Sequence, residues 1–323
     1  MRLITGQTDP RHIDNVNNIF IQIAAYRDPD LPATLRNLIE RAVEPERLHF
    51  GIFLQLKPDD PAEWSDFPDH SHMTVERVDA AVSQGACWAR SQAQKLYRDE
   101  PYWLQIDSHM RAVWGWDRLL LQMHAATGDH LAVLSTYPNA FLQPNQFLGD
   151  GCLPLIQPKG FEYYGLLTFS GALVKERFAK PKLSHCIAGG FIFGPGHAVK
   201  TVPYDPELYF HGEELSMAIR LFTHGYNLYN PNQNVLYHLY KKGEGQELTH
   251  WGDHSDWFKR NRKSMVRVHA LCGTLSTAPK SIEPNVLDLT DMDRYWLGRR
   301  RSLSDYEKAS GVNFKNQRVE SKS

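Results

Sequence analysis

The sequence predicts an α/β protein built on a doubly wound, mostly parallel β-sheet. Between residues 18 and 106 the apolar pattern follows the order strand, helix, strand, helix, strand, which is typical of such sheets. Polar residues directly follow the first of these strands, at Asp28, and the last, at Asp107. Sheets of this class bind ligands beyond the carboxyl ends of their strands, so we expect a binding site at that edge.

The first half of the chain supplies these elements in turn. Short apolar runs predict the strands, and apolar residues at helical spacing predict the helices. The expected order is a strand at 18–25, a helix at 32–42, a strand at 49–56, a helix after Gly85 and a strand at 102–106. Residues 57–72 are rich in proline and aspartate, which predicts an exposed loop.

The second half is less regular. Residues 215–224 carry apolar side chains on one helical face and end at Gly225, and residues 234–240 favour a strand. Residues 140–169 contain many glycines, prolines and tyrosines without a clear period. The chain beyond residue 240 is polar and basic, and we expect disorder over 315–323.

Composition excludes some classes of partner. The chain has 323 residues, 42% of them hydrophobic, and a net charge of -1, so we expect no nucleic-acid partner. Residues 1–18 are polar and carry no signal peptide, and no apolar run reaches the roughly 20 residues of a membrane span. The four cysteines form no CxxC pair, which favours free thiols in a reducing compartment, and we expect a cytoplasmic protein.

A metal site is the first chemical hypothesis. Asp107 and His109 flank one residue at a strand end, so both side chains can turn toward a shared ion. Carboxylate oxygen and imidazole nitrogen suit Mn²⁺, and other divalent ions such as Mg²⁺ less selectively. His238 lies in another strand-like segment and could complete the ligand set. The alternative is an aspartate that caps a turn beside a surface histidine.

Further charged residues allow two interpretations each. Glu213 and Glu214 precede a helix, where they either complement the helix dipole or stabilise positive charge on a bound substrate. Arg90 is either a solvated helical charge or a phosphate ligand close to a helix amino terminus, and Lys241 could also bind phosphate.

Taken as a set, these motifs resemble the GlcNAc-type polypeptide glycosyltransferases (glycosyltransferase family 60), typified by the cytosolic enzyme that modifies hydroxyproline. The resemblance covers residues 19–314. The segments that carry it are residues 25–29 (AYRDP), 89–90 with 96–97, 104–111 (LQIDSHMR) with 115–117 (GWD), 210–220 (FHGEELSMAIR), 225–226 with 230–231, 237–240 (YHLY), and 301–306 (RSLSDY) with Gly311.

This resemblance implies a GT-A fold, a UDP-sugar donor (most simply UDP-GlcNAc), a divalent cation and retention of the anomeric configuration. The sequence is also similar to the mucin-type GalNAc-transferases, where an Asp-x-His motif and a later histidine hold Mn²⁺. The implied metal ligands are therefore Asp107, His109 and His238. The carboxylate beside the transferred sugar would be Glu213 or Glu214.

The implied donor contacts are Arg27 and Asp28 to the uridine, with Arg90 facing the nucleotide and Asp107 and Lys241 completing the set. Two departures weaken the match. Lys241 and Lys242 stand where an arginine is expected, so a bidentate phosphate contact is in doubt. Residues 57–72 and 140–184 match nothing in the family, so the acceptor, a hydroxyl on a polypeptide or a glycan, stays open.

The expected domain organisation has a polar arm at 1–18 and a catalytic domain at 19–240. Its nucleotide-binding half covers 19–117 and its acceptor half 118–240, and an extension at 241–314 packs on it.

Front-side attack and double displacement both remain possible, the latter with Glu213 or Glu214 as nucleophile. The alternative function is a catalytically inactive nucleotide-sugar or glycan-binding protein of the same fold. A metal-dependent hydrolase is disfavoured because no HExxH helix is present.

Overall fold

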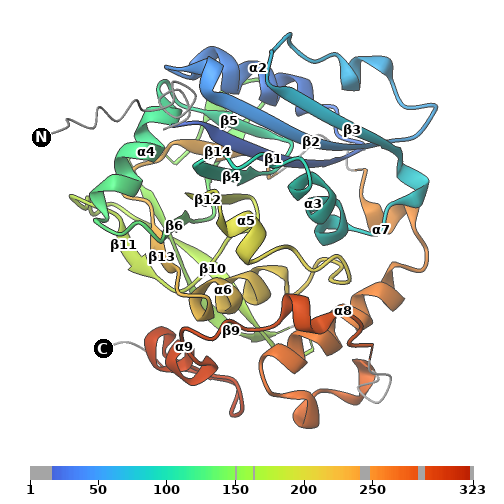
Figure 1. Ribbon diagram of the computed structural model, residues 1–323, viewed down its shortest axis with the longest axis vertical. Helices are drawn as coiled ribbons and strands as arrows, with labels where there is room; N and C mark the ends of the chain where they lie inside the picture. The colour runs from blue at the N-terminus through green and yellow to red at the C-terminus, as the bar shows by residue number, and fades with distance from the viewer. Residues whose placement is uncertain (1–16, 150, 163, 241–247, 283–287, 321–323) are drawn as a thin grey trace, which may run out of the picture.

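The computed structural model describes residues 17–149, 151–162, 164–240, 248–282 and 288–320. A single eight-stranded sheet dominates it (Figure 1). The strands, in spatial order, are β11 (Lys182–Ser184), β13 (Asn227–Asn230), β6 (Ala132–Ser135), β12 (Phe191–Pro195), β4 (Tyr102–Ile106), β1 (Ile19–Tyr26), β2 (Leu48–Leu56) and β3 (Met73–Asp79).

Most pairings in this sheet are parallel. The strand β1 runs parallel to β2 and β4, as do β2 to β3 and β13 to β6. The strand β12 is antiparallel to both of its neighbours, and the edge strand β11 is antiparallel to β13. The predicted α/β class with a mostly parallel sheet is therefore confirmed.

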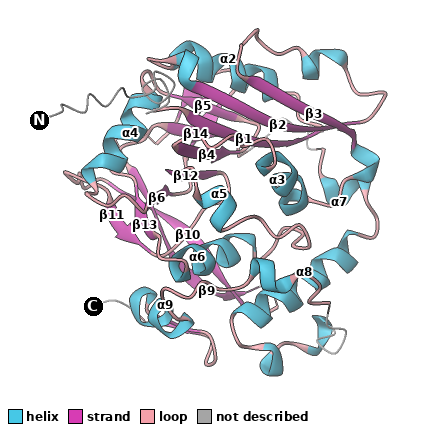
Figure 2. Cartoon of the chain, viewed as in Figure 1, coloured by secondary structure: helices cyan, strands magenta, loops and turns pink. Residues whose placement is uncertain are grey.

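Helices cover both faces of the sheet, as Figure 2 shows. In β1, Ile19 and Ile21 pack in one core with the helices α2 (Leu31–Arg41) and α4 (Trp116–Ala126), while Phe20 packs in the other core. The second core includes the helix α6 (Glu213–Thr223), and the helix α3 (Ala86–Gln94) also packs against β1. Alternate side chains of one buried strand thus serve two cores, because successive residues of a strand point to opposite faces.

A small second sheet continues the chain beyond β4. Its strands are β5 (Met110–Ala112), β14 (Leu236–His238), β7 (Asn139–Leu142) and β8 (Gln146–Phe147). The strand β14 runs antiparallel to β5, with His238 opposite Met110. This register places His238 beside the carboxyl end of β4, although the two lie far apart in the sequence.

The remaining elements include a hairpin and a helical carboxyl-terminal region. The helix α8 (Trp257–Leu271) packs against α6 and against β10 (Leu166–Val174) of the hairpin, and α9 (Leu303–Ser310) packs against α6. The elements are β9 (Leu153–Glu162), β10 (Leu166–Val174), α5 (Ala198–Thr201), α7 (His250–Asp253), α8 (Trp257–Leu271), α9 (Leu303–Ser310), β15 (Val312–Asn313), β16 (Arg318–Val319), and the 3₁₀ turns η1 (Pro45–Arg47), η2 (Ala62–Ser65), η3 (Ala80–Val82), η4 (Leu275–Thr277), η5 (Lys280–Ile282) and η6 (Met292–Tyr295).

Two sequence expectations need correction. Disorder over 315–323 is wrong for 315–320, because β16 pairs with β15 and the Glu320 amide donates a 2.7 Å hydrogen bond to the Gly311 carbonyl. Residues 321–323 lie outside the described part. The irregular stretch 140–169 contains strands, including all of β9, which pairs antiparallel with β10.

Among the helices in the described ranges, none has both the length and the apolar character to cross a membrane.

Candidate metal centre and cavity

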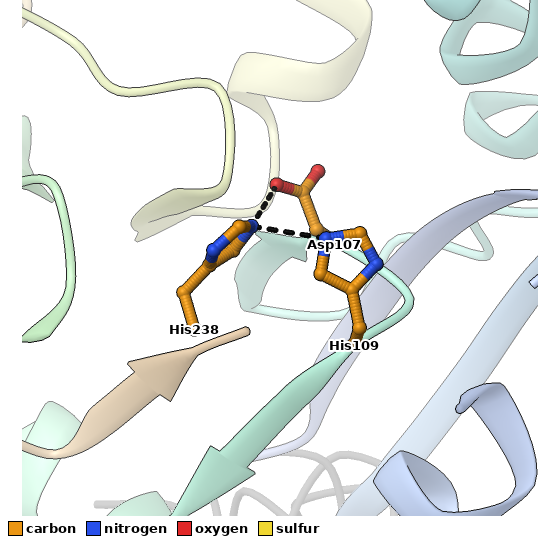
Figure 3. Close-up of side chains that lie close together, drawn as sticks. All are labelled: Asp107, His109 and His238. Atoms are coloured by element: carbon orange, nitrogen blue, oxygen red, sulfur yellow. Dashed lines mark hydrogen bonds and ion pairs between the residues drawn. The ribbon is translucent and has the colours of Figure 1, made fainter. Parts of the chain in front are cut away.

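Three predicted ligands converge at the carboxyl edge of the sheet. Asp107 follows β4 directly, His109 precedes β5, and His238 ends β14. Figure 3 shows the three side chains close together. Their ligand atoms all lie within 4.8 Å of one another. The His109 and His238 Nε2 atoms are 3.1 Å apart, and His238 Nε2 lies 3.2 Å from Asp107 Oδ2. Within the described ranges no other group of three such side chains converges in this way.

The charge of Asp107 suits a ligand. Burial alone would favour the neutral acid, but the hydrogen bond with His238 and the charge of Arg90 outweigh burial and hold the pKa of Asp107 below its ordinary value. One carboxylate and two imidazoles match the donor set preferred by Mn²⁺ and similar divalent ions. The residues present therefore fit a divalent cation.

Asp28 orients one of the imidazoles. Its Oδ2 lies 2.6 Å from His109 Nδ1 and also accepts a 2.5 Å hydrogen bond from Ser108 Oγ. A carboxylate that holds Nδ1–H leaves Nε2 free for a metal ion. The structure thus places Asp28 against His109, a predicted metal ligand, and also in the cavity lining, so the uridine contact that the resemblance implied stays a prediction.

This arrangement predicts the behaviour of Asp28→Asn. We expect the affinity for Mn²⁺ to fall by about 10-fold or more, because loss of the partner carboxylate loosens the His109 ring and lowers its basicity. Calorimetric titration with Mn²⁺ in the absence of nucleotide measures this. An unchanged affinity in a folded variant contradicts the role of Asp28.

Two glycines that the sequence did not single out pass close to the ligands. A Cβ atom added to Gly190 would lie 2.6 Å from Asp107 Oδ2, and one added to Gly189 would lie 2.7 Å from the Arg90 guanidinium. Both glycines precede β12, which is antiparallel to β4. A pair of adjacent glycines before an apolar strand is the signal that could have identified this close approach.

The predicted glutamates begin α6 at the same edge. Arg90 Nη1 donates a hydrogen bond to Glu213 Oε1, and Arg90 Nη2 donates a 2.8 Å bond to Asp107 Oδ1. Burial opposes the charge of Arg90, but Glu213 and its other anionic neighbours outweigh burial and raise the Arg90 pKa. Glu214 accepts hydrogen bonds from Tyr137 Oη and from the Gly189 amide. Burial raises the pKa of Glu214 to about 7.

A cavity of about 710 Å³ joins these groups. This volume lies within the range of small-molecule sites. Asp28, Arg90, the three ligands and both glutamates line it, together with aromatic residues of the carboxyl-terminal half. Those aromatic residues are Phe169, Tyr209, Phe210, Tyr240 and Trp251.

Another predicted donor contact, Arg27, lies elsewhere. Arg27 does not line the cavity, because its guanidinium is bound by Asp60 at 2.6 Å and by Asp253 at 2.8 Å. Asp253 also accepts hydrogen bonds from Tyr26 Oη at 2.7 Å and from Lys57 Nζ at 2.8 Å. It thereby joins the carboxyl end of α7 to the end of β1 and the loop that follows it. Lys241 lies outside the described residues.

Comparison with protein families decides the relationship of this chain. The family model described as Glycosyltransferase (GlcNAc) matches residues 18–68 and 65–316. The chain belongs to this GlcNAc glycosyltransferase family. The three ligands, Asp28 and both glutamates all lie within the matched residues. No curated protein matches the chain.

One solved structure supports the fold. A structure of GalNAc-T7 with UDP, GalNAc and Mn²⁺ superposes with a TM-score of 0.64 at 13% identity. The match covers 91% of this chain and 56% of the GalNAc-T7 chain, so this protein spans little more than half of that relative. A Staphylococcus aureus TarS fragment (S. aureus TarS 1-349) has a TM-score of 0.49 at 10% identity, over 90% of this chain and 72% of TarS. The fold is of the GT-A type, as the sequence resemblance implied.

Proposed function

We propose that this protein is a metal-dependent, retaining glycosyltransferase that moves GlcNAc from UDP-GlcNAc to a hydroxyl group on a polypeptide or glycan. The observation that carries this proposal is the convergence of Asp107, His109 and His238 on one wall of a cavity that also holds two glutamates. Family membership and the UDP and Mn²⁺ in the GalNAc-T7 structure support it. A hydroxyproline or threonine acceptor and a cytoplasmic location are parts of the same proposal.

Each ligand has a defined task in this proposal. Asp107, His109 and His238 would hold Mn²⁺, or Mg²⁺, which when bound neutralises the charge that develops on the departing UDP. Asp28 keeps His109 in the tautomer that presents Nε2 toward the cavity. Three protein ligands leave coordination positions for the diphosphate oxygens.

Glu214 is the carboxylate that we place beside the transferred sugar. Its side chain lines the cavity and is partly exposed, and its oxygens are fixed by Tyr137 and the Gly189 amide. A fixed carboxylate at this position stabilises the positive charge that builds up at the anomeric carbon. In the front-side route the acceptor hydroxyl attacks from the face that UDP leaves, and a phosphate oxygen takes its proton.

The test is UDP release from a panel of UDP-sugars, with Mn²⁺, with Mg²⁺ or with EDTA. We expect slow hydrolysis of UDP-GlcNAc that requires the divalent ion, and little hydrolysis of the other donors. Turnover of a different UDP-sugar would correct the donor and keep the reaction class. If no donor turns over but UDP and Mn²⁺ together raise the melting temperature, the chain is a nucleotide-sugar-binding protein and the proposed transfer is wrong.

A further inference from the structure

The two neighbouring glutamates of α6 differ in their surroundings. Glu213 is only 4% exposed, and its Oε1 accepts hydrogen bonds from Arg90 Nη1 and from Tyr204 Oη, the latter at 2.7 Å. Glu214 is partly exposed and bonds to neither residue. One oxygen of the Glu213 carboxylate, Oε1, is therefore held by two partners within the protein.

Arg90 connects Glu213 to the predicted metal ligand Asp107. One nitrogen of its guanidinium binds Glu213, and the other donates the 2.8 Å bond to Asp107 Oδ1. The second Asp107 oxygen, Oδ2, faces His238 at 3.2 Å. Arg90 thus occupies one oxygen of the ligand and leaves the other directed at the two imidazoles. A planar guanidinium suits this role because its two nitrogens are held in a fixed geometry.

A chain of buried amide side chains supports the pair from behind. Gln105 Nε2 donates hydrogen bonds to Tyr204 Oη at 2.6 Å and to the Gly189 carbonyl at 2.8 Å. Gln22 Nε2 donates to Gln105 Oε1 at 3.1 Å, and Gln22 Oε1 accepts from Trp103 Nε1 at 2.9 Å. Gln22, Trp103 and Gln105 are each 1% exposed or less. A connected buried network of this kind holds its members in one arrangement.

We propose that Glu213, acting through Arg90, is a positioning residue that sets the orientation of the metal ligand Asp107, whereas Glu214 is the glutamate that serves the substrate. This inference rests on the proposed function, because it assigns tasks within the same site. It separates two adjacent residues that the sequence could not distinguish. It also gives Arg90 a task other than the nucleotide contact that the sequence resemblance implied.

The network makes a graded prediction about metal binding without any nucleotide. Glu213→Gln removes the charge that holds Arg90, so we expect the Kd for Mn²⁺ to rise by about 10-fold, and Arg90→Met should raise it by about 10- to 100-fold. Tyr204→Phe removes a single hydrogen bond to Glu213 and should raise the Kd by about 2- to 10-fold. The matched control is Glu214→Gln, which should leave the Kd for Mn²⁺ within about twofold while reducing sugar transfer.

The measurement is calorimetric titration of each full-length variant with Mn²⁺, together with its melting temperature and its UDP-release rate. Equal Mn²⁺ affinity in Glu213→Gln and Glu214→Gln overturns the inference, as does an Arg90→Met variant that loses only UDP affinity. If Glu213→Gln does not fold, Tyr204→Phe decides the question, because it retains every charge. Failure of the wild-type protein to bind Mn²⁺ even with UDP overturns the proposed function itself, so the two failures are distinguishable.

Discussion

Replacing Asp107 by alanine is expected to reduce Mn²⁺-dependent UDP release by about 1,000-fold or more. Asp107 is the only carboxylate among the three ligands, and its loss leaves two imidazoles without an anionic partner. A bound divalent ion contributes several kcal/mol of charge stabilisation in the transition state, and each 1.36 kcal/mol corresponds to about 10-fold in rate. The measurement is the rate of UDP release at saturating donor with Mn²⁺ and with EDTA.

A second aspartate provides the control for this experiment. Asp66 is paired with Arg36 on the surface, where its side chain is 73% exposed, and Asp66→Ala should keep the wild-type rate and metal dependence. If Asp107→Ala is folded and retains a rate within about 10-fold of the wild type in Mn²⁺, Asp107 does not serve as a ligand.

The second large effect is expected from Gly190→Ala. The new methyl group would lie 2.6 Å from Asp107 Oδ2 and 3.8 Å from His238 Cδ2, so the Asp107 carboxylate must shift from its present position. Since sub-ångström misplacement at a reaction centre is costly, we expect a loss of about 100-fold in the UDP-release rate and weaker Mn²⁺ binding. Rate and calorimetry together measure the change.

The hairpin offers a matched control for that substitution. Gly160 lies in β9, where an added Cβ atom meets nothing within 4 Å, so Gly160→Ala should behave as the wild type in both measurements. A Gly190→Ala variant with normal Mn²⁺ affinity and a normal rate would show that Asp107 Oδ2 does not bind the ion in the orientation described.

Local sequence patterns predicted the two site residues that directly follow a single strand, Asp107 and His109. Asp107 and His109 were identifiable because they follow a short apolar strand, and their position relative to the sheet edge follows from the strand order. His238 needed an additional argument, because the pairing of β14 with β5 that places it there is a long-range contact. The resemblance to known enzymes supplied that argument.

Residues whose tasks depend on tertiary partners were assigned less well. Asp28 and Arg27 are neighbours in the sequence, but Asp28 bonds to His109 and Arg27 to Asp60 and Asp253. Nothing in the local sequence pattern distinguishes a carboxylate that contacts a bound nucleotide from one that orients a histidine side chain. Similarly, β3 was missed because it is an edge strand in which the alternation of Met73 and Val75 with polar residues breaks at Arg77.

The tie between Asp253 and the loop after β1 has a consequence for the order of synthesis. The walls of the cavity come from residues as early as Ala24 and as late as Trp251. Arg27 and Asp253 are separated by 226 positions, so the contact that joins these walls forms only after Asp253 has been synthesised. A nascent chain that ends at residue 240 already contains all three metal ligands but lacks one side of the chamber. The cavity is therefore complete only after residues 248–251, which supply its last wall, have been added to the chain.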